Sequence, residues 1–76
     1  MKMRVIVYAM HGCCQCRVVE NVLKRNDIPF EERDGKELIG DSRFEGASMP
    51  VMFIDENYYY IGAEECLSAL NEIIGE

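Results

Sequence analysis

The feature that most constrains the fold is an apolar run near the start of the chain, which a glycine breaks and a helical pattern follows. Met3–Ala9 is rich in β-branched and aromatic residues, which is typical of a strand buried on both faces. His11-Gly12 interrupts the run, Arg17–Asn26 has helical periodicity, and Ile28–Arg33 resembles a short second strand. This part of the chain therefore predicts two parallel strands joined by a right-handed helical crossover.

The helix prediction depends on an apolar stripe at one-turn spacing, formed by Val18, Val19, Val22 and Leu23. Glu20, Lys24 and Arg25 fall outside this stripe, so we expect them to face water. The helix is thus expected to lay one side on the sheet and to keep its charged side in solvent.

The rest of the chain predicts a weaker helix, a hairpin and a final helix. Lys36–Phe44 has a helical pattern that Gly40 interrupts, while Pro50–Ile54 and Tyr58–Ile61 are expected to form a β-hairpin. Ala63–Ile74 has an apolar face and acidic residues in its first turn, where the helix dipole favours them. The order βαβ-α-ββα predicts an α/β domain with a four-stranded mixed sheet.

The length of 76 residues leaves room for one core, so we expect a single domain over residues 1–76. A formal net charge of −6 would repel nucleic-acid phosphates and anionic lipid, so neither is an expected partner. The N-terminal apolar stretch is too short for a signal peptide, and no run approaches the length of a membrane span. These features predict a cytoplasmic protein, and we expect a monomer.

Three of the four cysteines, Cys13, Cys14 and Cys16, lie within four residues, and Cys66 is far away. Secreted disulfide scaffolds spread their cysteines along the chain to staple loops. Crowded cysteines indicate redox chemistry or metal binding instead. Zinc prefers four ligands, usually as two separated pairs, and only Cys66 and His11 could complete such a set. Redox chemistry is therefore favoured, and no metal site is expected.

Cys13 falls between the first strand and the first helix, so it is predicted to lie near the helix N-terminus. Unpaired N–H groups and the helix dipole stabilise a thiolate there, and such settings lower a cysteine pKa from about 8.5 to roughly 3.5–7.5. Gly12 and Arg17 flank the pair and are expected to tune the thiolate. Cys16 comes nearly one helical turn later, whereas Cys14 points about 100° away. Cys13 is thus the expected nucleophile and Cys16 the resolving thiol.

Three segments together resemble the glutaredoxin family over essentially the whole chain. They are Cys13-Cys14-Gln15-Cys16 after the first strand, Ser48-Met49-Pro50 before the third, and Ile61-Gly62-Ala63 before the last helix. The resemblance implies a thioredoxin-like fold and disulfide reduction, with glutathione as the usual reductant and no permanently bound cofactor. It also implies a cis-proline at Pro50 and a substrate or glutathione site that includes Met49, Pro50, Gly62, Ala63 and Glu65.

Several positions differ from typical members. Cys14-Gln15 replaces the usual Pro-Tyr, Met10 replaces a common lysine, and Ala63 replaces the second glycine of a Gly-Gly pair. A glutamine before the second cysteine is similar to redoxins that reduce ribonucleotide reductase and are themselves reduced by thioredoxin reductase. The two resemblances therefore imply glutathione or a flavoprotein of that type as the reductant, and a disulfide-containing protein such as ribonucleotide reductase as the substrate.

Other interpretations stay open from the sequence. Some glutaredoxins hold an iron–sulfur cluster through the nucleophilic cysteine, so the resemblance also allows an iron–sulfur or metal carrier. Cys66 lies on the apolar face of the last helix, which favours a buried structural thiol over a second redox role. His11 is a solvated loop residue or a group that tunes Cys13.

Overall fold

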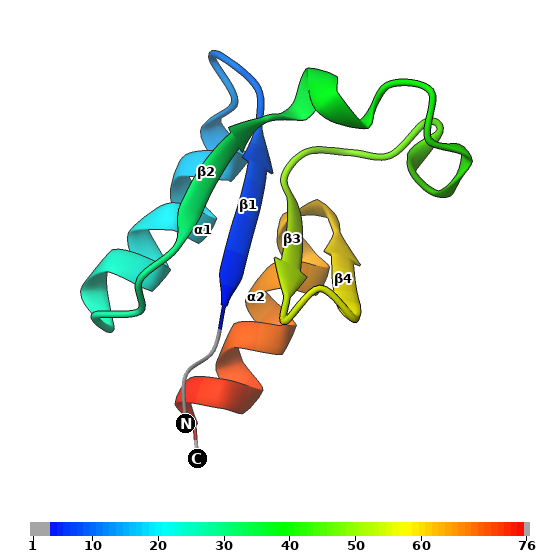
Figure 1. The fold of residues 1–76 in the computed structure, drawn as a ribbon. Helices are drawn as coiled ribbons and strands as arrows, with labels where there is room; N and C mark the ends of the chain where they lie inside the picture. The colour runs from blue at the N-terminus through cyan, green and yellow to red at the C-terminus, as the bar shows by residue number, and fades with distance from the viewer. Residues whose placement is uncertain (1–3, 76) are drawn as a thin grey trace.

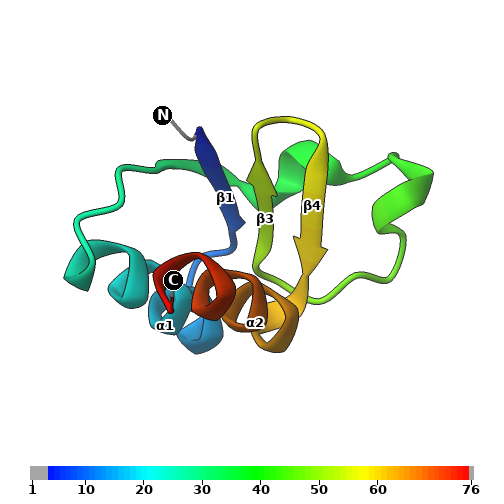
Figure 2. The same cartoon turned by 90° about the horizontal axis from the view of Figure 1, so that it is seen from below.

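In a computed structural model, which describes residues 4–75, both α-helices lie on one face of a four-stranded sheet (Figures 1 and 2). The strands stand in the order β2-β1-β3-β4, with β1 parallel to β2 and antiparallel to β3, and β3 antiparallel to β4. The elements are β1 Val5–Ala9, α1 Cys14–Arg25, β2 Glu31–Asp34, β3 Val51–Ile54, β4 Tyr58–Ile61 and α2 Gly62–Ile74. The mixed sheet and thioredoxin-like topology are therefore confirmed. The start predicted for the first strand, Met3, lies outside the described residues.

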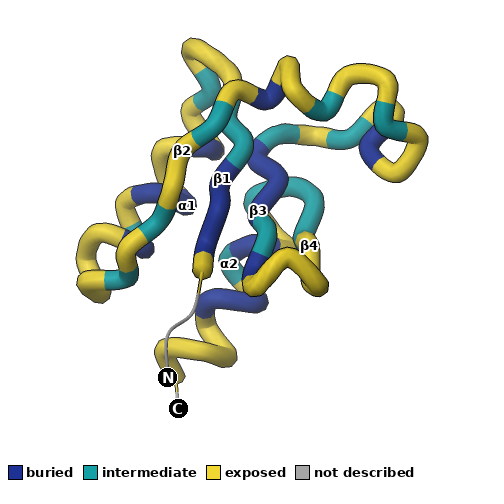
Figure 3. Tube along the Cα trace, in the orientation of Figure 1, coloured by how far each residue is buried: buried dark blue, intermediate teal, exposed yellow. Residues whose placement is uncertain are grey.

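The hydrophobic core lies between the sheet and the two helices. Alternate residues of β1 and β3 point toward the helices, because successive side chains of a strand point to opposite faces. They are Val5, Val7, Met52 and Ile54, and they form one cluster with Val19, Leu23, Cys66, Ala69 and Leu70. Figure 3 shows this buried layer running along β1, β3 and the inner sides of α1 and α2.

The opposite face of the sheet carries an aromatic cluster instead of a helix. Phe44 contacts Phe53 and Tyr59 in edge-on geometry, with ring centroids 5.7 and 5.2 Å apart, and Tyr8 stands 5.7 Å from Phe53. Such aromatic pairs add stability beyond the area they bury. Phe44 therefore anchors the segment between β2 and β3 to the sheet.

The helix predicted over residues 36–44 is not formed. The segment makes two short 3₁₀ turns, η1 Gly35–Leu38 and η2 Ser42–Phe44, capped by the side chains of Asp34 and Asp41. Gly40 lies between them with φ of +95°, a conformation that ends a right-handed helix. The segment therefore folds as two capped turns that extend past β3 and β4 (Figure 1).

Two side chains of α1 differ from the sequence prediction. Val18 is 47% exposed although it belongs to the predicted apolar stripe, and Glu20, which was expected to face water, is only 9% exposed. The buried face of α1 is thus rotated relative to the prediction, and its centre lies on Cys16, Val19, Glu20 and Leu23.

Among residues 4–75, no helix is long and apolar enough to cross a bilayer.

Candidate active site

The loop between β1 and α1 brings two cysteines together. Cys13 is the N-cap residue of α1, Cys16 lies in its first turn, and their sulfur atoms form a disulfide across Cα atoms 5.3 Å apart. The helix begins at Cys14, earlier than the predicted Arg17, because the Cys13 side chain caps it. The expected proximity of Cys13 and Cys16 is therefore confirmed.

The two sulfurs have different surroundings. Cys13 is partly exposed, while Cys16 is only 2% exposed. The backbone N–H of Cys16 donates a hydrogen bond to Cys13 Sγ at 3.1 Å. A helix N-terminus that directs an N–H toward a sulfur stabilises negative charge on it, which lowers the pKa of a cysteine once reduced. Of the pair, Cys13 is thus the sulfur that solvent reaches and the helix end favours.

Gly12 allows the tight turn that places Cys13 at the cap. Its φ of +80° lies in the left-handed region that glycine adopts without a steric penalty. The N–H of Cys13 closes the turn on the carbonyl oxygen of Met10 at 3.2 Å. Arg17 is exposed on α1, and His11 is exposed in the loop.

The segment before β3 lies at the same end of the sheet as this loop. Val51 pairs with Tyr8 near the end of β1 and with Ile61 at the end of β4. Pro50 therefore lies between the end of β1 and the start of α2. The Met49–Pro50 peptide bond is cis, as the resemblance to glutaredoxins implied.

Side-chain and backbone contacts join these segments. The N–H of Gly62, the first residue of α2, donates to the carbonyl oxygen of Pro50 at 2.8 Å. A Cβ atom on the buried Gly35 would lie 2.8 Å from the sulfur of Met49 and 3.2 Å from that of Met10, so both methionines lie against this glycine. The disulfide loop, Gly35, the Met49–Pro50 segment and the start of α2 thus meet at one end of the sheet.

The remaining predicted binding residues, Gly62, Ala63 and Glu65, lie at the start of α2. Gly62 has a φ of +86°, and Ala63 is partly buried against the core. The Glu65 carboxylate accepts a hydrogen bond from the N–H of Ile61 at 3.2 Å, which satisfies one of the unpaired donors at the helix start. Glu65 therefore stabilises the end of its own helix in this structure.

The two remaining cysteines differ sharply. Cys14 is an exposed free thiol, and Cys66 is fully buried. The thiol of Cys66 is 3.6 Å from the carbonyl oxygen of Tyr60 and 3.8 Å from that of Pro50, with hydrogen-bonding geometry. Burial raises its pKa from 9.0 to about 11. The prediction that Cys66 is buried is confirmed, and its position places it directly against the backbone of the cis-proline.

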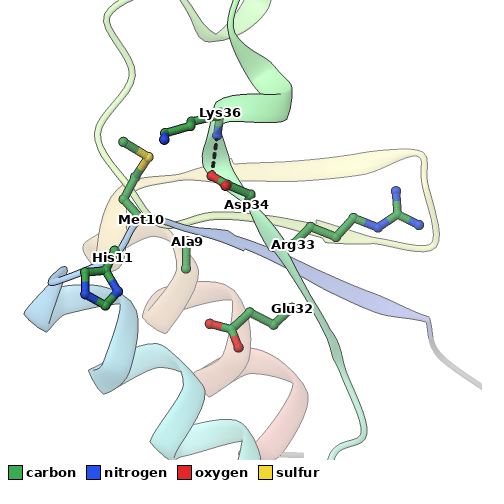
Figure 4. Close-up of a pocket in the computed structure, with 7 residues that line it drawn as sticks. All are labelled: Ala9, Met10, His11, Glu32, Arg33, Asp34 and Lys36. Atoms are coloured by element: carbon green, nitrogen blue, oxygen red, sulfur yellow. Dashed lines mark hydrogen bonds between the residues drawn. The ribbon is translucent and has the colours of Figure 1, made fainter.

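Two cavities open beside the disulfide loop. One, of about 460 Å³, is lined by Ala9, Met10, His11, Glu32, Arg33, Asp34 and Lys36 (Figure 4). The other is smaller and largely apolar, about 210 Å³, and extends from Met10 and Met49 to Ile39 and Phe44.

Within residues 4–75, no cluster of three or more His, Cys, Asp or Glu side chains is arranged to bind a metal ion.

Comparison with known proteins decides the family. The glutaredoxin family model matches residues 5–59, most of the chain. The chain belongs to the glutaredoxin family. The fold of this glutaredoxin also matches a crystal structure of glutaredoxin 1 from Francisella tularensis complexed with cacodylate, with a TM-score of 0.73 and 23% sequence identity over 97% of this chain and 99% of that one. No curated protein matches the chain.

Glutaredoxins are thiol–disulfide oxidoreductases, and in this glutaredoxin the Cys13–Cys16 pair supplies the dithiol. Family members generally work with glutathione as a reductant and not as a permanent cofactor. Sequence reasoning missed the burial of Glu20, which belongs with Cys16 to the buried face of α1. The available signal was its spacing, because Glu20 follows Cys16 by four residues and thus shares its helix face.

Proposed function

We propose that this glutaredoxin reduces protein disulfides by a dithiol mechanism in which Cys13 is the nucleophile and Cys16 the resolving thiol. The Cys13 thiolate attacks a substrate disulfide, which forms a mixed disulfide and releases one substrate sulfur. Cys16 then attacks Cys13, which releases the second substrate sulfur and leaves the Cys13–Cys16 disulfide. The observation that supports these roles most strongly is the asymmetry of the pair, a partly exposed sulfur at the helix cap and a buried one behind it.

The substrate is proposed to lie along Met49-Pro50, with Gly62, Ala63 and Glu65 at the other side of the site. An extended peptide can pair with the backbone of Met49 as an added strand does. The apolar cavity beside Met10 and Met49 is the proposed site for an apolar side chain of that peptide. Gly12 and Arg17 are proposed to favour the thiolate, Gly12 through the turn and Arg17 through its positive charge.

Glutathione is the proposed physiological reductant, since the family generally works with it. The alternative reductant is a flavoprotein of the thioredoxin-reductase type, with ribonucleotide reductase as the proposed protein substrate. The role is that of an electron carrier in the cytoplasm, where thiols are kept reduced. We propose that the chain acts as a monomer.

A coupled assay tests these proposals. Disulfide reduction is followed through NADPH oxidation, once with glutathione and glutathione reductase and once with thioredoxin reductase. We expect turnover in the glutathione assay, its loss in Cys13→Ser, and accumulation of a mixed disulfide in Cys16→Ser. Cys14→Ser is the matched control and should retain the rate. An unchanged rate in Cys13→Ser would refute the proposed nucleophile, and turnover only with thioredoxin reductase would refute glutathione as the reductant.

A further inference from the structure

The most unusual buried group in the molecule is the carboxylate of Glu20. The residue is 9% exposed, and its Oε2 atom is buried without a hydrogen-bond partner among the described residues. Burying a carboxylate without a partner is costly, so such groups usually carry a proton or perform a function. The mechanism described so far makes no use of it.

Glu20 is placed close to the resolving thiol by the helix itself. Cys16 and Glu20 are four residues apart on α1, and both belong to its buried face. Side chains at this spacing are neighbours, with Cβ atoms about 5–6 Å apart. The Cα–Cβ bonds of a helix also tilt toward its N-terminus, so a side chain at position 20 is directed toward the turn that holds Cys16.

The second neighbour of Glu20 is another carboxyl group, that of Glu32 on β2. Two carboxylates can only accept hydrogen bonds, so a bond between them requires a proton on one. Burial raises the pKa of Glu20, and the neighbouring carboxyl group of Glu32 raises it further. Lys24 and Arg17, from the same helix, oppose this shift but do not cancel it. Glu20 is thus a carboxyl group prepared to accept a proton at a pH where ordinary glutamates remain ionised.

Glu32 also connects this buried position to solvent. It is exposed, it lines the larger cavity beside the disulfide loop, and Figure 4 shows its carboxyl group extending from β2 toward the helix side of the sheet. A proton accepted by Glu20 can therefore leave through Glu32 and the open cavity. Cys16 itself is almost completely buried, so its proton has no comparable direct exit.

We propose that Glu20, with Glu32, accepts the proton of the Cys16 thiol during resolution of the mixed disulfide. This inference rests on the proposed roles of Cys13 and Cys16. The proton passes from Cys16 Sγ to a Glu20 carboxylate oxygen, directly or through one water, and Glu32 stabilises the protonated form. The Cys16 thiolate attacks Cys13 Sγ, the bond between Cys13 and the substrate sulfur breaks, and that sulfur leaves as a thiolate.

The reaction of the reduced protein with 5,5′-dithiobis(2-nitrobenzoate) separates the two steps. Attack by Cys13 releases one equivalent of coloured thiolate, and resolution by Cys16 releases a second. Cys14→Ser is the background, because the exposed Cys14 would also react. Stopped-flow traces are recorded from pH 5 to 9 for this protein and for Glu20→Gln, with Glu72→Gln on the exposed side of α2 as a matched charge control.

We expect Glu20→Gln to slow the second phase at least tenfold near pH 6.5, while the first phase changes less than twofold. The difference should shrink toward pH 9, where hydroxide removes the Cys16 proton directly. A second phase in Glu20→Gln that follows the control at every pH would overturn the inference. Failure to release two equivalents in the background protein would refute the dithiol mechanism instead, so the two failures are distinguishable.

Glu32→Gln gives a second test on an exposed residue, which does not depend on the folding of the first variant. An amide at this position donates to the Glu20 carboxylate, which stabilises its charged form and makes it a weaker base. We expect the second phase to slow and its pH inflection to move to lower pH. An inflection that stays in place would contradict the proton route.

Discussion

The burial of Cys66 predicts a thiol that is nearly inert in the folded protein. Burial raises its pKa from 9.0 to about 11. At pH 8, the thiolate fraction of such a group falls from about 9% to about 0.1%, a factor of about 100. A more basic thiolate is also more nucleophilic, which raises its reaction rate roughly tenfold. The change in ionisation is therefore expected to slow the reaction of the Cys66 thiol about tenfold in total.

Access of the reagent lowers the rate further. Cys66 is 0% exposed in the core cluster, so alkylation must wait for local opening of α2. We therefore expect iodoacetamide to modify Cys66 at least about 100-fold more slowly in the native oxidised protein than in the urea-unfolded oxidised chain. Peptide mapping by mass spectrometry measures both rates, and Cys14 serves as the exposed reference thiol. A ratio below about ten for Cys66 would refute the burial argument and reopen a second redox role.

Three further results are expected. Leu70→Ala should lower the free energy of unfolding by about 2–5 kcal/mol in urea titrations, because Leu70 is fully buried; a loss below 1 kcal/mol would contradict the described core. Gly35→Ala should displace the Met10 and Met49 side chains and raise the KM for a protein disulfide with little change in kcat, whereas an unchanged KM would argue against a substrate at these methionines. Glu20→Gln should be more stable than wild type at pH 8 and lose that advantage by pH 4, as measured by urea unfolding. Because the pKa of Glu20 is raised in the folded state, the unfolded chain loses the Glu20 proton at a lower pH than the folded protein does. The wild-type protein therefore loses stability as pH rises above about 4.5. A stability difference that does not change with pH would contradict this.

The sheet and both helices were predictable because their patterns are local. The apolar run that became β1 and the periodicity of α2 depend only on neighbouring residues, and the position of Cys13 between strand and helix indicated its place at the helix cap. The helix predicted over 36–44 is absent because the apolar periodicity there is weak. Two aspartate side chains cap short turns instead, and Gly40 adopts a left-handed conformation that ends a helix.

Features that depend on tertiary contacts could not be predicted from the sequence. The burial of Glu20 depends on where β2 passes over α1, and helical periodicity alone gives no information on that neighbour. The cis bond at Pro50 was expected only from the family resemblance, since an X–Pro bond is cis in roughly 5–6% of cases. The convergence of Met10 and Met49 on Gly35 likewise follows from the register of β1, β3 and the following loop.

The most direct measurement is the thiolate absorbance at 240 nm of the reduced protein, recorded against pH for wild type, Cys13→Ser and Cys16→Ser. If the α1 cap activates Cys13, one thiol should ionise with a pKa below about 7.5, persist in Cys16→Ser and disappear in Cys13→Ser. An acidic thiol that survives in Cys13→Ser, or no ionisation below about pH 8 in wild type, would contradict the account.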